Sequence, residues 1–131
     1  MAPSAVAPFT LDVFEHDEPY EVEGDVRYGR SHIVKTFEGD LVAKSTVEML
    51  SVRGEGDGAG YVALETVRGT LAGRTGSFAI LHAGTMQGDE VWARWPISPG
   101  SGTGELETIT GEARIEIAPD GAHTLYLEYE L

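Results

Sequence analysis

Apolar and β-branched residues gather along this chain in runs of about nine to twelve residues, and clusters of glycine and acidic residues separate the runs. In the last run, Leu125, Leu127 and Tyr129 alternate with more polar neighbours, which is the period of a half-buried strand. Frequent Val, Ile, Thr, Tyr and Phe favour the same structure. The pattern predicts eight β-strands, over residues 9–15, 26–37, 41–52, 61–71, 74–86, 91–98, 112–118 and 123–131.

Short turns connect most of these strands, so we expect neighbours in sequence to pair in meander order. An open meander of this size exposes two strand edges, whereas closure removes them and creates an interior for side chains or one small ligand. The fold class expected is therefore all-β, a small closed antiparallel barrel, with a two-sheet sandwich as the alternative. The turn signals lie at residues 23–25, 38–40, 54–58, 72–73, 87–89 and 119–121.

The segment 41–52 is ambiguous, because Ala43, Val47 and Leu50 also satisfy helical spacing. Its Lys, Glu, Met and Ala residues favour a helix as well. Turns flank the segment closely, and we therefore predict a strand.

The length of 131 residues fits one domain. We expect a flexible N-terminal segment over residues 1–8 and a single barrel domain over residues 9–131. The chain has no Cys, which excludes disulfides and thiolate chemistry. Neither a signal peptide nor a membrane span is recognisable, and this favours a cytoplasmic location.

The formal net charge is −13, from 9 Lys and Arg against 22 Asp and Glu. Such a charge repels phosphate backbones and anionic lipid surfaces, so nucleic acid and membranes are not expected as partners. Acidity of this kind also serves solubility alone.

Three segments carry a resemblance to a known family: residues 69–86, residues 99–106 with the sequence Pro-Gly-Ser-Gly-Thr-Gly-Glu-Leu, and residues 127–131. With them, the chain resembles a bacterial family of unknown function that has an allene-oxide-cyclase-like barrel. Similar barrels serve as allene oxide cyclases, as dirigent proteins and as cyclases in natural-product pathways, without a redox cofactor. The resemblance thus implies a barrel and no cofactor, and it carries over no catalytic residue.

Motifs of other classes are weak. Residues 100–105 look superficially like a phosphate loop, but no Lys-Ser or Lys-Thr pair follows and Glu105 would repel phosphate. We interpret them as a glycine-dependent crossover in which Ser101 and Thr103 cap backbone groups. No nucleophile elbow is present. The four His fall on separate elements without metal-ligand spacing, so no metal site is expected.

Strand register places ionisable groups together. If Ala72-Gly73 is a two-residue hairpin loop, Glu65 pairs with Ile80 and His82 becomes its diagonal neighbour on the same face. That face is mainly apolar and is expected to line the interior as a ligand-binding surface. Its other members are Tyr61, Val67, Phe78 and Ile80.

Two further turns extend this surface conditionally. A turn centred near residues 55–57 places Glu48 opposite Glu65, and a one-residue slip removes that pairing. A three-residue turn over 87–89 adds Trp92 and Arg94 to the same face. Glu65, His82 and Glu48 are then the candidate catalytic groups, because coupled carboxylates and an imidazole in an apolar site suit acid–base chemistry. A buried structural cluster explains the same residues.

In a dry interior, Glu65 is expected to titrate above about 4.3 unless His82 or Arg94 holds it charged. The function expected is capture of a small, largely apolar molecule inside the barrel, with cofactor-free isomerisation or cyclisation as its enzymatic version. A non-catalytic binding protein and a structural barrel are the alternatives. An apolar strip on the outside would favour a homodimer, but the sequence does not locate one.

Overall fold

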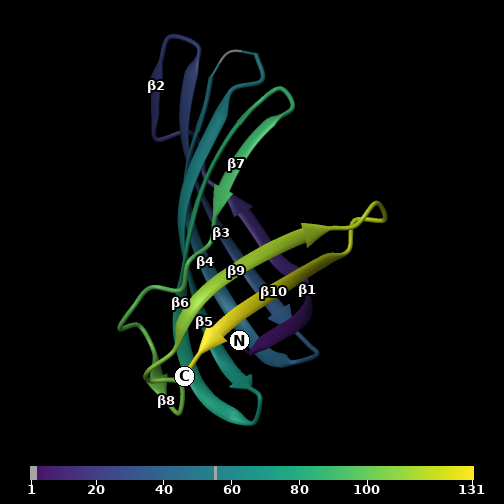
Figure 1. Ribbon diagram of the computed structural model, residues 1–131. Helices are drawn as coiled ribbons and strands as arrows, with labels where there is room; N and C mark the ends of the chain where they lie inside the picture. The colour runs from purple at the N-terminus through teal and green to yellow at the C-terminus, as the bar shows by residue number, and fades with distance from the viewer. Residues whose placement is uncertain (1–2, 55) are drawn as a thin grey trace.

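The computed structural model describes residues 3–54 and 56–131, and within them the chain forms one antiparallel sheet curled into a barrel (Figure 1). The strands follow the predicted runs closely, with two short additions, β2 and β8. Their bounds are β1 Ser4–His16, β2 Glu21–Glu23, β3 Val26–Phe37, β4 Leu41–Arg53, β5 Ala59–Leu71, β6 Arg74–Gln87, β7 Glu90–Arg94, β8 Thr103–Gly104, β9 Thr110–Ile117 and β10 His123–Glu130.

The sheet runs in the order β7-β6-β5-β4-β3-β1-β10-β9, which is largely a meander. The residues that follow β7 close the sheet by joining β6 to β9. Leu81 N–H donates to Pro96 C=O at 2.8 Å, and Ile97 N–H donates to Gly111 C=O at 2.9 Å. The segment from Trp95 to Ser98 is thus a bridge between β6 and β9. The prediction of an all-β, eight-stranded antiparallel barrel is confirmed, with closure nearly complete.

The predicted strand over 91–98 is divided in two. Its first half is β7, which forms a hairpin with β6, and its second half is the bridge to β9. Pro96 and Pro99 explain the division, because proline lacks the N–H that a continuous ladder needs.

The ambiguous segment is a strand, as predicted. In β4, Leu41, Ala43, Ser45 and Val47 are buried, and the residues between them face outward or are less buried. Since β4 pairs with β3 on one side and β5 on the other, tertiary pairing outweighs its helix-favouring composition.

The N-terminal region differs from expectation. Ser4–Pro8 pair with β10 and form the first half of β1, in place of the flexible segment predicted for residues 1–8; residues 1–2 lie outside the described residues. Ala5 and Ala7 are small enough to alternate inward against the core, which buries a stretch that has no strong strand signal.

One end of the barrel is filled by the main hydrophobic core. The crossover after the bridge covers this end, near β8 in Figure 1, with Leu106 and Ile109 both buried. Ser101 Oγ accepts the N–H of Ala79 at 3.0 Å and donates to the Ser98 carbonyl at 2.7 Å, so the capping role predicted for Ser101 is confirmed. Thr103 Oγ1 instead lies 2.6 Å from the side-chain hydroxyl of Ser77. The core comprises Ala5, Ala7, Phe9, Phe37, Leu41, Ala43, Val67, Leu71, Phe78, Ile80, Ile97, Leu106, Ile109, Ala113, Leu125, Leu127 and Tyr129.

Close strand contact in this core requires glycine at position 69. A Cβ there would lie 2.2 Å from the Val42 carbonyl oxygen and 2.5 Å from the Ala43 Cα. We therefore expect Gly69→Ala to lower the free energy of unfolding by about 1–3 kcal/mol through overpacking. Urea denaturation followed by circular dichroism measures this.

Gly58→Ala is the matched control, because a Cβ at that position would have no atom of the described residues within 4 Å. It should change the free energy of unfolding by less than about 0.5 kcal/mol. Equal effects of the two substitutions would contradict the close contact at Gly69.

Candidate functional site

The β5–β6 hairpin positions the candidate site. Ala72 and Gly73 have φ of 50° and 80°, the left-handed values that a two-residue hairpin turn requires. Glu65 pairs with Ile80, and His82 pairs with Ala63. The predicted register of this hairpin is confirmed, so the side chains of Glu65 and His82 are diagonal neighbours on the interior face.

Glu65 is the centre of a buried polar cluster. Its Oε1 lies 2.8 Å from His82 Nε2 and accepts a hydrogen bond from Lys35 Nζ at 3.2 Å, while its Oε2 accepts one from Ser45 Oγ at 2.5 Å. Only 1% of Glu65, 6% of Lys35 and 7% of His82 is exposed. We call Lys35, Ser45, Glu65 and His82 the interior charge cluster.

Burial by itself raises the pKa of Glu65, because desolvation disfavours the charged carboxylate. The hydrogen bond with His82 and the positive charge of Lys35 act in the opposite direction and outweigh it, so the pKa of Glu65 lies below its usual range. The pKa of Glu65 is therefore not raised, which is the case expected if a neighbour such as His82 holds the carboxylate charged. Lys35 contributes to the same effect. Arg94 has no part in it.

Sequence reasoning missed Lys35 and Ser45. Lys35 lies on β3 directly opposite Ser45 of β4, and its ammonium also stands 4.7 Å from the centre of the Phe9 ring. One signal was available: Ile33, Lys35 and Phe37 alternate along a predicted strand, which places a lysine among interior positions. That Lys35 reaches Glu65, two strands away, is visible only in the folded barrel.

The interior face changes character beyond the cluster, toward the end where the β2–β3, β4–β5 and β6–β7 hairpins project (Figure 1). Leu11 is paired with Lys35, and Phe14 is paired with Ile33, so both share the interior face; they are 38% and 47% exposed. Met49 and Tyr61 on this face are partly buried. Solvent therefore reaches apolar interior side chains at this end, which we call the open end.

Trp95 is a third residue that sequence reasoning missed. The Ile80–Ile97 bridge, continued by two residues, places Trp95 beside His82 on the interior face. Its ring packs against the core, and its Nε1 is buried without a hydrogen-bond partner among the described residues. The sequence favoured Trp92 because a three-residue turn was expected after β6, whereas the two-residue turn places Trp95 on the interior face.

The predicted ligand-binding residues of the β5–β6 hairpin all lie on the interior face. Val67, Phe78 and Ile80 belong to the packed core, and Tyr61 lies toward the open end. Gly84 gives the Tyr61 ring its room, since a Cβ there would lie 2.6 Å from the ring. Whether these residues contact a ligand stays a prediction.

The prediction that Glu48 faces Glu65 is wrong. The turn after β4 pairs Arg53 with Ala59, one residue away from the register expected, so Val47 lies opposite Glu65. Glu48 is on the outer face, where its carboxylate is 2.6 Å from His32 Nδ1. A one-residue slip moves every side chain of a strand to the other face, which is why this error removes Glu48 from the interior.

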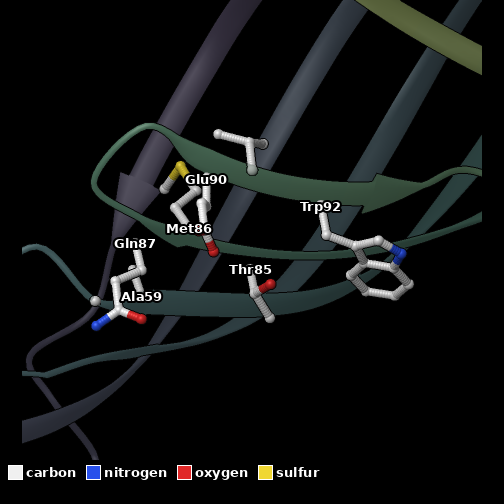
Figure 2. Close-up of a pocket in the computed structure, with 8 residues that line it drawn as sticks. Ala59, Thr85, Met86, Gln87, Glu90 and Trp92 are labelled. Atoms are coloured by element: carbon white, nitrogen blue, oxygen red, sulfur yellow. The ribbon is translucent and has the colours of Figure 1, made fainter.

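The predicted interior position of Trp92 and Arg94 is also wrong. Gln87 pairs with Glu90, so the turn holds two residues and not three. Trp92 lies opposite Thr85 on the outer side, 53% exposed, at a shallow cavity of about 470 Å³ near the hairpin tip (Figure 2). Arg94 Nη2 donates to Glu112 Oε1 at 2.6 Å, away from the interior.

Within residues 3–54 and 56–131, no group of three His, Asp or Glu side chains is arranged to hold a metal ion. No helix in the described part of the chain is long and apolar enough to cross a membrane. The buried ionisable groups Lys35, Glu65 and His82 form one network with Ser45, which is satisfied mainly by its own members. Nearer the open end, His16 Nδ1 lies 2.7 Å from Ser31 Oγ as a separate pair.

The fold and the site define a small antiparallel β-barrel protein with a buried charge cluster below a partly open apolar interior. The chain belongs to the family described as protein of unknown function DUF3224, whose model matches residues 5–129. The predicted membership of a family of unknown function is thereby confirmed.

A solved structure supports the same assignment. The chain is similar to a protein with unknown function from the DUF3224 family of Shewanella oneidensis MR-1, with 34% sequence identity and a TM-score of 0.92. The similarity covers 100% of this chain and 98% of that one. No curated protein matches the chain.

The interior charge cluster predicts a specific dependence of stability on pH. Because the pKa of Glu65 in the folded state is below its usual 4.5, the ionised carboxylate stabilises the fold above that pH. The contribution is lost as the pH falls through the folded-state pKa. Glu65→Gln leaves Lys35 without its counter-charge and should cost about 3–5 kcal/mol at neutral pH.

Thermal melts of the wild type and Glu65→Gln from neutral pH to pH 3 test this. The gap in melting temperature should be constant down to about pH 4.5 and should narrow below it. Glu130→Gln, which changes an exposed carboxylate on β10, is the control and should show little difference at any pH. A gap for Glu65→Gln that widens on acidification would contradict the assignment.

Proposed function

We propose that this barrel binds a small, largely apolar molecule through its open end, with a polar group of the ligand directed to His82. The observation that carries the proposal is the position of the interior charge cluster below apolar side chains that solvent reaches. Ligand sites in proteins commonly combine an apolar lining with a few convergent polar groups. Phe14, Met49, Tyr61 and Trp95 supply the lining, and His82 lies beside Trp95 in the strand register.

The energetics of the cluster support a functional reading. Burying Lys35 and Glu65 removes two charges from water, and well-packed apolar residues of similar size stabilise a core as well or better. Buried ionisable groups with a shifted pKa, such as Glu65, are found at functional sites more often than elsewhere. The alternative is a non-catalytic structural barrel, in which the cluster only specifies packing.

A second candidate is a cofactor-independent isomerase or cyclase of bacterial secondary metabolism, as the resemblance to allene-oxide-cyclase-like barrels implies. The Glu65–His82 contact favours it. In a neutral imidazole, donation from Nε2 to Glu65 leaves Nδ1 as an acceptor that can take a proton from a substrate. Glu65 would be a positioning residue, and the apolar lining would hold a flexible substrate in a reactive shape.

Binding is measurable with N-phenyl-1-naphthylamine, an uncharged apolar fluorophore. The chain has two Trp, so Trp92→Phe leaves Trp95 as the sole tryptophan reporter. We expect saturable probe fluorescence together with quenching of Trp95. Met49→Lys places a charge among the interior lining residues and should weaken binding by about tenfold or more, the equivalent of about 1.4 kcal/mol.

Leu50→Lys is the matched control, because the adjacent residue on β4 faces outward. It should leave the affinity for the probe unchanged. If Leu50→Lys weakened binding and Met49→Lys did not, the probe would occupy the outer surface and the proposal would fail.

The ligand itself is accessible to native mass spectrometry of the protein purified from its own cells. We expect a non-covalent adduct of small-molecule mass that is released on denaturation and is absent from Met49→Lys purified in the same way. An adduct retained equally by this variant would place the molecule elsewhere.

The enzymatic candidate predicts the tautomer of His82. For the neutral imidazole, long-range ¹H–¹⁵N correlation spectra should show a proton on Nε2 and none on Nδ1, because Nε2 faces the Glu65 carboxylate. Glu65→Gln should redistribute the tautomers. A proton on Nδ1 in the wild type would remove the proposed proton acceptor.

A further inference from the structure

The outer face of β4, β5 and β6 carries a contiguous set of aliphatic side chains. Leu50, Val62 and Ala83 lie side by side across the three strands, and Leu64 and Leu81 follow in the next outward-facing row. Val62 is 55% exposed and Leu64 is 57% exposed. These five residues, which we call the outer apolar patch, contribute to a hollow of about 660 Å³.

Such a patch differs from the scattered apolar residues of an ordinary surface. Single exposed aliphatic side chains are common, but contiguous groups mark binding surfaces. None of these five side chains belongs to the barrel core, because their strand neighbours Met49, Ala63 and His82 take the interior positions. Folding of one chain therefore leaves the patch uncovered.

Two opposite charges border the patch on the same side. Arg30 of β3 lies in the row of Leu50, next to it, and Glu48 of β4 lies in the row of Leu64. Glu48 contacts His32, its neighbour on β3. On this side a cation and an anion therefore lie one row apart, and on the far side the row of Ala83 continues to Arg94 of β7.

We propose that the outer apolar patch binds a second copy of this chain, forming a symmetric dimer. The twofold axis lies in the interface, runs at right angles to the strands and passes midway between the two rows. Rotation about it places the Leu50 row of one copy against the Leu64 row of the other. Val62 then faces the partner's Leu64, and Ala83 faces the partner's Leu81. On β3 and β4 the same operation sets Arg30 over the partner's His32 and Leu50 over the partner's Glu48, so Arg30 lies one strand from the carboxylate that His32 contacts. The interface is isologous, as in most soluble dimers.

The charges at the border of the patch favour a second copy as the occupant. The protein has a formal charge of −13, so two copies repel one another over most of their surface. The patch is uncharged at its centre, and the twofold arrangement brings the bordering Arg30 to the strand next to the partner's Glu48, so this face offers two copies a contact between opposite charges. An anionic lipid surface is repelled by the same net charge.

Sedimentation velocity over a range of protein concentrations tests the proposal. The wild type should show a concentration-dependent dimer. Leu64→Lys should abolish it, and Val42→Lys, which adds the same charge to an exposed outer position of β4 outside the patch, should not. Circular dichroism melts establish that both variants fold.

Charge reversal tests the symmetry. Arg30→Glu and Glu48→Arg should each weaken dimerisation by about tenfold or more, because each places like charges together across the interface. The double variant Arg30→Glu/Glu48→Arg retains the net charge of the wild type and should restore the dimer.

A wild type that stays monomeric at about 100 μM would overturn the proposal, since a biological contact of ordinary strength is then absent. A dimer that Val42→Lys disrupts and Leu64→Lys leaves intact would also overturn the proposal. The same holds if the double variant dimerises no more strongly than the two single variants. A monomer that sediments with neutral phosphatidylcholine vesicles through Leu64 would assign the patch to lipid and would equally exclude the second copy. None of these outcomes depends on a ligand in the interior.

Discussion

A buried carboxylate imposes the strictest condition on this barrel. Glu65 has almost no contact with water, so its charge is tolerable only while His82, Lys35 and Ser45 keep their places around it. These neighbours come from three other strands, β6, β3 and β4. The register of half the barrel is therefore coupled to one side chain, and the groups that satisfy Glu65 also leave His82 below the apolar lining of the open end.

Closure makes that arrangement possible. The bridge from Trp95 to Ser98 joins β6 to β9, and it brings Ile97 into the core and Trp95 next to His82. The glycine-rich crossover then covers one end with Leu106 and Ile109. One end is packed and the other is partly open, so the interior side chains that form the core are separated from those that solvent reaches.

Alternation along the strands gives the two faces of the sheet different roles. Met49 faces the interior and Leu50 the outside, one residue apart on the same strand. The proposed ligand site and the proposed dimer contact thus lie back to back on β4, β5 and β6. A substitution at one position affects one face, so the two roles can be separated experimentally even though the strands are shared.

The hydrophobic pattern by itself determined the fold class, most strand positions and the β5–β6 hairpin. These depend on local physics: period-2 alternation, turn residues, and a two-residue loop whose backbone geometry sets the pairing of Glu65 with Ile80. Loop geometry that spacing does not specify led to errors. Across the turn after β4 the observed pairing differs by one residue from the expected one, so Glu48 faces outward. The turn after β6 holds one residue fewer than expected, so Trp92 and Arg94 face outward as well. Only the tertiary structure decided that Lys35, Ser45 and Trp95 join the site, because their contacts cross strands far apart in sequence and depend on how the barrel closes.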